Sequence, residues 1–145
     1  MVSINKFLKE VLEPVLADPD NGILAADNET PIGPVLMVTS LPPDSVTHEY
    51  LAFVRHITGS EFGHGRDFAS ITADCYGPDE LVAGNIAEFV RETLRDAQRR
   101  QTVYPSGYIS TYECPVVPFP FPRLDDVSGQ ERSTAQYRLL IKALT

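Results

Sequence analysis

Apolar residues recur at intervals of three and four along the first part of the chain. They form one stripe of a helix that opens after Ser3, whose side chain suits an N-cap, and the stripe comprises Ile4, Phe7, Leu8, Val11, Leu12, Val15 and Leu16. Pro14 lacks the N–H for a bond back to Glu10, so we expect it to kink this helix or restart it as a second short turn. The segment 17–33 is rich in Asp, Asn and Gly, which predicts a loop.

Three runs typical of strands follow at residues 34–41, 50–58 and 67–76, each rich in β-branched and aromatic residues. In the third run one set of positions is apolar and the other polar: Ala69, Ile71, Ala73 and Cys75 alternate with Ser70, Thr72 and Asp74. This alternation predicts an antiparallel sheet with one face on the core and one face in solvent. The glycine-rich segment 59–66 is expected to form a long, flexible hairpin loop between the second and third strands.

The clearest helix in the sequence lies within residues 77–100. Pro78 fits its first position, and Asp79 and Glu80 follow where the positive end of the helix dipole favours carboxylates. Its predicted buried stripe comprises Val82, Ile86, Phe89, Val90, Thr93, Leu94 and Ala97. We expect this helix to pack on the apolar face of the sheet.

Two further strands are predicted at residues 107–117 and 131–143, separated by a run rich in proline and phenylalanine. Prolines in that run exclude a helix and allow at most an edge strand, so we expect an extended, poorly self-paired segment there. The element order predicts an α+β fold: a mainly antiparallel sheet of about five strands, with the N-terminal helix and the long helix packed on one face. The whole chain, 1–145, is expected to be a single domain with a Pro/Phe-rich excursion at residues 115–130.

Composition narrows the possible functions only slightly. Hydrophobic residues make up 43% and charged residues 22% of the 145 residues, which is ordinary for a globular domain. The formal net charge of −8 argues against a protein that grips nucleic acid, because phosphate contacts need clustered Lys and Arg. The first apolar stripe is interrupted by charges, so it predicts neither a signal peptide nor a membrane span, and we expect a cytoplasmic location. Cys75 and Cys114 are expected to be free, buried thiols.

No phosphate loop, dinucleotide fingerprint, GxSxG elbow or HExxH motif is present, and we predict neither catalytic nor cofactor-binding residues. A metal site would need ligands gathered at one sheet edge, and the available groups match no ligand spacing: His48, His56, His64, Asp67 and Asp74. Cys75 falls on the apolar side of its strand, where burial is expected rather than nucleophilic chemistry. We therefore predict no metal site.

The side chains of Phe119 and Phe121 in the proline run could take one of two positions. They either close over the domain's own core or occupy a groove of a partner, because exposed apolar patches commonly mark interfaces. The prolines lower the entropy lost when such a segment docks. The candidate interface residues are Phe119, Phe121, Arg123, Asp125 and Asp126.

Three segments resemble the tail terminator (tail completion, or neck) proteins of long-tailed bacteriophages. They are "YLAFVRHITGS", "DFASITADCYGPDELVAGNIAEFVRETL" and "ERSTAQYRLLIKA". The likeness consists of a strand that ends in a glycine loop, a strand of pattern D-x-A-x-(I/V)-x-(V/A)-D-x-(Y/W) that runs into a helix, and a last strand close to "R…A.YRL.I.A". The N-terminal helix and the strand after it also fit, so the resemblance spans nearly the whole chain.

The resemblance implies a structural virion protein located in the tail or neck and assembled in the host cytoplasm. Such proteins form a ring, commonly hexameric, that caps the tail tube and joins it to the head–tail connector or stopper protein, while DNA passes through the lumen without specific binding. It also implies no enzymatic activity, no cofactor and no membrane contact, and it assigns no single functional residue. A head-completion or connector-stopper protein of the same neck is the near alternative. A small metal-dependent enzyme or ligand-binding domain that uses Asp67, Asp74 and His56 is the alternative from another class.

Overall fold

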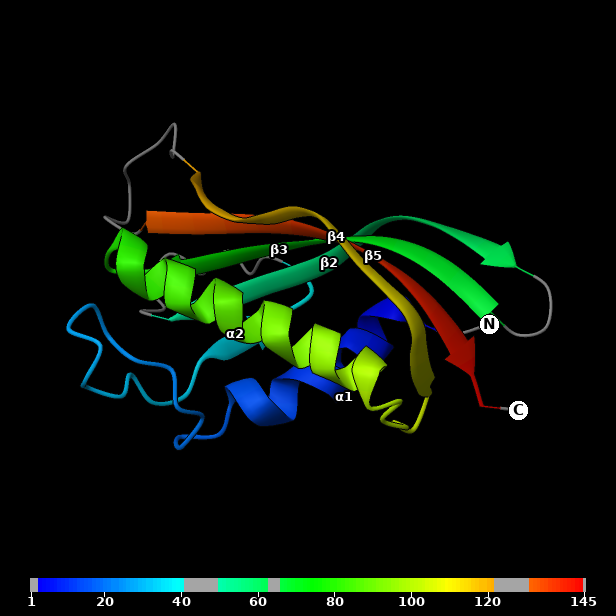
Figure 1. The fold of residues 1–145 in the computed structure, drawn as a ribbon, viewed down its shortest axis with the longest axis horizontal. Helices are drawn as coiled ribbons and strands as arrows, with labels where there is room; N and C mark the ends of the chain where they lie inside the picture. The colour runs from blue at the N-terminus through cyan, green and yellow to red at the C-terminus, as the bar shows by residue number, and fades with distance from the viewer. Residues whose placement is uncertain (1–2, 41–49, 63–65, 122–130, 145) are drawn as a thin grey trace.

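The computed structural model describes residues 3–40, 50–62, 66–121 and 131–144, together with the side chains of all of these except 60–62 and 121. Along the chain the described elements are α1 (Ile4–Leu16), β1 (Leu36–Val38), β2 (Leu51–Phe62), β3 (Arg66–Gly77), α2 (Glu80–Arg99), β4 (Gly107–Phe121) and β5 (Glu131–Ala143) (Figure 1). This order of two helices and five strands confirms the α+β fold predicted from the sequence.

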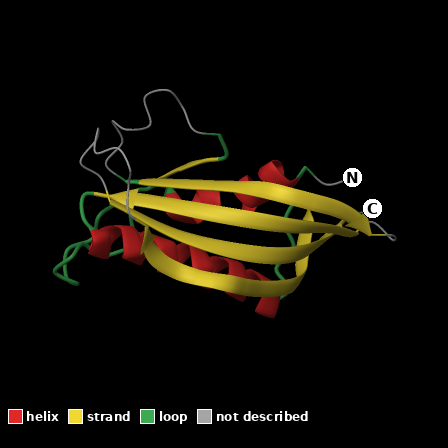
Figure 2. Cartoon of the chain, turned by 90° about the horizontal axis from the view of Figure 1, so that it is seen from above, coloured by secondary structure: helices red, strands yellow, loops and turns green. Residues whose placement is uncertain are grey.

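The sheet has the strand order β1-β2-β3-β5-β4. β1 runs parallel to β2, and the other three pairings are antiparallel. Both helices pack on the same face, with α1 against β1 and β2 and with α2 against β3, β4 and β5. Figure 2 looks onto the opposite face, which we call the outer face because it is turned away from α1 and α2.

The first helix begins as predicted, and it continues past Pro14, where a restart was one of the two alternatives. The Ser3 hydroxyl accepts a hydrogen bond from the backbone N–H of Lys6 at 3.4 Å, so Ser3 is the N-cap. The helix runs without a restart through Pro14 to Leu16. Glu10 joins it to the turn before β4, since its carboxylate accepts hydrogen bonds from the backbone N–H and the hydroxyl of Ser106 at 2.8 and 2.6 Å.

The second helix begins two residues later than its proline predicted. Asp79 is the N-cap, and its side chain accepts a hydrogen bond from the Val82 N–H at 2.9 Å, so Pro78 precedes the helix instead of occupying its first position. Phe89 and Thr93 lie at the margin of the contact with the sheet and are only half-buried. The buried stripe is formed by Val82, Ala83, Ile86, Ala87, Val90, Leu94 and Ala97.

The alternation predicted for residues 67–76 is confirmed on the side of the helices. Ala69, Ile71, Ala73 and Cys75 belong to the core that α1, α2 and the sheet share. The prediction of a solvated polar face was wrong for Thr72 and Asp74, which are 6% and 5% exposed on the outer face. Asp74 is satisfied there by the Thr134 hydroxyl, which donates to its carboxylate at 2.7 Å.

Two strands continue further than the sequence predicted. Residues 59–62 and 66 continue the β2–β3 hairpin, with Gly59 opposite Ala69, so the long loop was a wrong prediction for them; residues 63–65 lie outside the described part of the chain. Residues 118–121 continue β4 beyond the strand predicted at 107–117, with Phe119 opposite Thr134 of β5, and residues 122–130 of the predicted excursion lie outside the described part of the chain. The prediction that the proline run allows only an edge strand is confirmed, because β4 is the last strand of the sheet.

Candidate interaction surface

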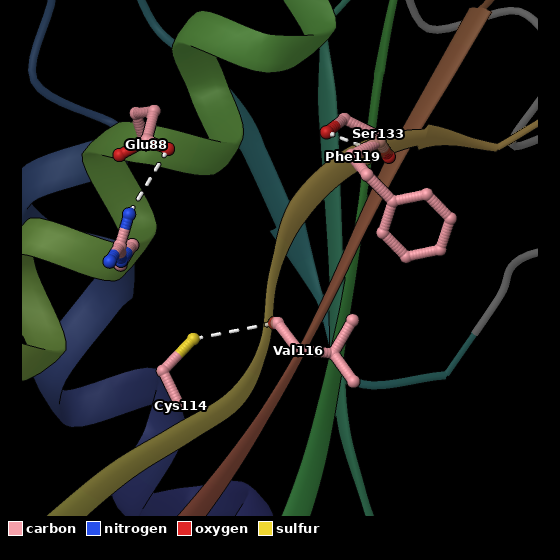
Figure 3. Close-up of polar contacts among 6 residues, drawn as sticks. Glu88, Cys114, Val116, Phe119 and Ser133 are labelled. Atoms are coloured by element: carbon pink, nitrogen blue, oxygen red, sulfur yellow. Dashed lines mark hydrogen bonds and ion pairs between the residues drawn. The ribbon is translucent and has the colours of Figure 1, made fainter.

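Phe119 lies near the end of β4 on the outer face. The residue is 39% exposed, and its backbone carbonyl accepts a hydrogen bond from the Ser133 hydroxyl at 3.3 Å (Figure 3). Phe121 pairs with Arg132 through its backbone, while its side chain lies outside the described residues. Arg123, Asp125 and Asp126 also lie outside them. Of the five residues proposed as an interface, Phe119 is thus the one with a described side chain.

Irregular pairing decides which way the side chains of β4 point. The register shifts once between Glu113 and Val116 and again between Val116 and Phe119, so every third residue of this stretch lies opposite an outer-face position of β5. In Figure 3 the side chains of Val116 and Phe119 point away from α2, whereas Cys114 points toward it. The Cys114 thiol donates to the carbonyl oxygen of Val116 at 3.3 Å. The bulges therefore add two apolar side chains to the outer face.

Basic residues gather on the same outer face. Strand register puts them beside outer-face positions such as Thr72 and Ser70, because successive residues of a strand point to opposite sides of the sheet. Of the eleven Lys and Arg residues in the described part of the chain, five lie there: Arg55, Arg66, Arg132, Arg138 and Lys142. The described acidic side chains on this face are Asp74, which is buried, and Glu113.

The exposed cations on the outer face are held only weakly by their neighbours. The Arg55 guanidinium lies 4.9 Å from the centroid of the Phe53 ring, at cation–π distance. Arg138 lies 3.9 Å from the Glu113 carboxylate, and both side chains are more than half exposed, so this pair contributes little to stability. Positive charge on this face thus remains accessible to a partner.

A cluster of exposed acidic residues lies on the helix side of the sheet. Residues 10–54 contain no Lys or Arg, and their acidic residues are Glu10, Glu13, Asp18, Asp20, Asp27, Glu29, Asp44 and Glu49. The part of this region between α1 and β1, which we call the acidic loop (residues 17–30), carries Asp18, Asp20, Asp27 and Glu29, all exposed. It packs on the helix side, where the Asn85 side chain donates to the Leu24 carbonyl at 2.8 Å (Figure 1).

Asp27 holds the tip of the acidic loop. Its carboxylate accepts hydrogen bonds from the backbone N–H groups of Glu29 and Thr30, both at 2.9 Å, and from the Thr30 hydroxyl at 2.7 Å. These bonds, those from Thr30 foremost, lower the pKa of Asp27 to about 2. The loop therefore keeps this negative charge throughout the physiological pH range.

The fold does not bring together the side chains that were considered as metal ligands. His56 lies on the helix side of β2, with its Nδ1 3.3 Å from the Asn5 amide oxygen, whereas Asp74 lies on the outer face. His48 and His64 lie outside the described residues. Within the part of the chain that the structure describes, no group of three or more His, Cys, Asp or Glu side chains could hold a metal ion. None of the described helices is long and apolar enough to cross a membrane.

Both cysteines are reduced, as predicted, but they differ in environment. Cys75 is completely buried, and burial strongly raises the pKa of its thiol. Cys114 is only half-buried, contrary to the prediction, and burial raises its pKa as well. Since a nucleophilic cysteine needs a lowered pKa, the burial predicted for Cys75 agrees with its environment.

The basic outer face was not recognised from the sequence. Its residues come from three strands and become neighbours only through the strand register. A partial signal is present in residues 131–143, where Arg132, Arg138 and Lys142 occupy alternate positions opposite the apolar ones. No protein-family model matches this sequence, and a search of curated proteins finds no match either.

Proposed function

We propose that this protein is a structural virion component that caps the tail tube of a long-tailed bacteriophage as an oligomeric ring and presents the surface that joins tail to head. Its partners would be other copies of itself, the tail tube protein and the head–tail connector or stopper protein. DNA would pass through the lumen without specific binding. The role would be structural, without catalysis or a cofactor.

The observation that carries the proposal is where the resembling segments lie. The first, residues 50–60, contains most of β2; the second, residues 67–94, contains most of β3 and α2; and the third, residues 131–143, is β5. β2, β3 and β5 are adjacent strands at the centre of the sheet, and α2 packs against two of them. The resemblance thus follows one contiguous structural unit instead of scattered fragments, as expected for a shared fold.

Ring assembly also needs surfaces that a single copy leaves available. The outer face combines aromatic and arginine side chains, which are enriched at protein interfaces. β4 offers an edge, and its prolines at positions 115, 118 and 120 deny backbone donors to a partner strand. Indiscriminate strand pairing at that edge is thereby disfavoured, so side chains would have to supply most of the contact.

Native mass spectrometry and negative-stain electron microscopy of the purified protein test the proposal. We expect particles with a central hole. Their mass should be a multiple of the 16.0 kDa mass of one chain, and the resemblance implies about six chains per particle. A monomer that binds a metal ion stoichiometrically would contradict it. Gene order offers an independent check, because a tail terminator is expected between the connector genes and the major tail protein gene.

A further inference from the structure

We propose that the outer face of one copy docks on the acidic loop of the next copy, in a head-to-tail contact between two different surfaces of the same chain. The inference deepens the proposed ring function and rests on it. The occupant is a second copy of this chain, and the contact is made by Arg55, Arg138 and Lys142 on one side and by Asp18, Asp20, Asp27 and Glu29 on the other.

Charge complementarity within one chain carries this inference. The acidic loop carries four exposed carboxylates and no cation, while the exposed cations of the outer face have weak partners. Opposite potentials on two surfaces steer association and fix its register. A chain with a net charge of −8 would otherwise repel its own copies, so segregation of the charges is what makes self-association favourable.

The positions of the two surfaces determine the symmetry of the contact. The outer face cannot pair with the same face of another copy, because like charges would meet across the interface. The acidic loop lies on the helix side of the sheet and is fastened there by Asn85. A contact between two different surfaces is heterologous, and such contacts close into rings when the rotation per subunit permits.

Apolar side chains on the outer face supply binding energy that charges alone would not. Phe119 is 39% exposed and Leu36 is 40% exposed, and both lie on this face at opposite edges of the sheet. The exposed charges between them are expected to set specificity and association rate more than affinity. The contact should therefore weaken as the salt concentration rises, because the charges then act over a shorter distance, but it should not disappear.

Lysine placement permits a direct test by zero-length crosslinking. The chain has three lysines, Lys6, Lys9 and Lys142, and Lys142 is the one on the outer face. A carbodiimide joins an amine to a carboxylate only where the two touch. In a mixture of isotopically labelled and unlabelled protein at low salt, we expect intermolecular crosslinks from Lys142 to the acidic loop. Absence of such crosslinks at high protein concentration would overturn the inference.

Charge reversal sharpens the test, because two defective variants should complement each other. Arg55→Glu with Arg138→Glu replaces two of the three contact cations of the outer face by anions, and Asp20→Lys with Glu29→Lys replaces two of the four loop carboxylates by cations, all at exposed positions. Each double variant alone should lose self-association by about tenfold or more. An equimolar mixture should regain it, since the unaltered outer face of the loop variant fits the unaltered loop of the face variant, while the substituted residues of the other two surfaces carry opposite charges. The regained complex should contain crosslinks from Lys142 of the loop variant to the acidic loop of the face variant.

A control variant distinguishes this contact from a general effect of charge. Lys9→Glu with Arg95→Glu makes the same charge change at exposed positions on the two helices, and it should leave self-association intact. Thermal unfolding of every variant checks that the fold is retained. If neither reversed variant is impaired, or if the mixture fails to recover, the inference is wrong.

The outcomes also separate this inference from the ring proposal. Rings that persist in both reversed variants would leave the proposed function standing and remove this contact. Crosslinks and recovery in the mixture without ring particles would support the contact and contradict the ring. Binding of a DNA duplex tests whether the outer face binds nucleic acid instead of a second copy. If Arg55→Glu with Arg138→Glu abolishes DNA binding but leaves self-association unchanged, the outer face binds nucleic acid and the inference fails.

Discussion

At the scale of single residues, Asp27 provides a stability contribution that depends on pH. Its pKa is lowered from 3.8 to about 2, so the folded state favours its charged form. A carboxyl group whose pKa is lowered by folding stabilises the fold at pH values above its unfolded-state pKa. This stabilisation is lost as the pH falls through the folded-state pKa. We predict that Asp27→Ala lowers the thermal midpoint at neutral pH, and that its difference from the unaltered protein shrinks as the pH falls from about 4 to about 2.

Thr30→Val serves as the matched control for Asp27. It removes the hydroxyl that donates to the carboxylate but keeps both backbone donors, so its effect should be smaller and follow the same pH range. Thermal unfolding followed by circular dichroism across that range measures both. A gap between Asp27→Ala and the unaltered protein that stays constant down to about pH 2 would contradict the assignment.

At the scale of elements, we predict that substitution by alanine has opposite effects on stability at two glycines. Gly107 begins β4 with φ 154°, and an added Cβ would collide with the backbone carbonyl of Lys142 on β5. Gly84 lies within α2, where an added Cβ would meet nothing within 4 Å. Gly107→Ala should lower the free energy of unfolding by about 2 kcal/mol, whereas Gly84→Ala should raise it by about 1 kcal/mol. Urea denaturation measures both, and equal effects would refute the strand pairing at Gly107.

The end of β4 is predicted to matter for assembly more than for folding. Phe119→Ser removes a side chain that is already 39% exposed, so it should cost only about 1 kcal/mol of stability. It should nevertheless weaken self-association, because an aromatic anchor is lost from the outer face. Val103→Ser is the control, since Val103 is 62% exposed in the turn after α2. A large loss of thermal stability with unchanged assembly would show that Phe119 is a core residue instead.

Sequence periodicity predicted the elements better than their pairing. Apolar spacing identified both helices and the sheet because each buries one face against the same core. It did not predict the parallel pairing of β1, since a short apolar run carries no direction. Nor did it predict that β4 continues past residue 117 through Pro118, because an edge strand tolerates proline where its N–H is not needed by β5.

At the scale of the whole molecule, charge distribution matters more than net charge. The total of −8 predicts an acidic protein and gives no hint that basic residues share one face. Alternation places Arg132, Arg138 and Lys142 together, but Arg55 joins them only because β3 lies between β2 and β5. That this site is a protein interface stays a prediction from the sequence, and Phe119 is the one of its candidate residues whose described side chain lies on the outer face. The rest required the sheet order.

Assembly through the outer face predicts that stability depends on protein concentration. Self-association stabilises only folded copies, so the thermal midpoint at low salt should rise as the protein is concentrated. High salt should reduce this dependence, because the charges act over about 3 Å at 1 M salt against about 10 Å at 0.1 M. Arg55→Glu with Arg138→Glu should remove most of it while leaving the midpoint of the dilute protein nearly unchanged, and Lys9→Glu with Arg95→Glu should keep it. A midpoint independent of concentration in the unaltered protein would show that folded copies do not associate through any surface under these conditions.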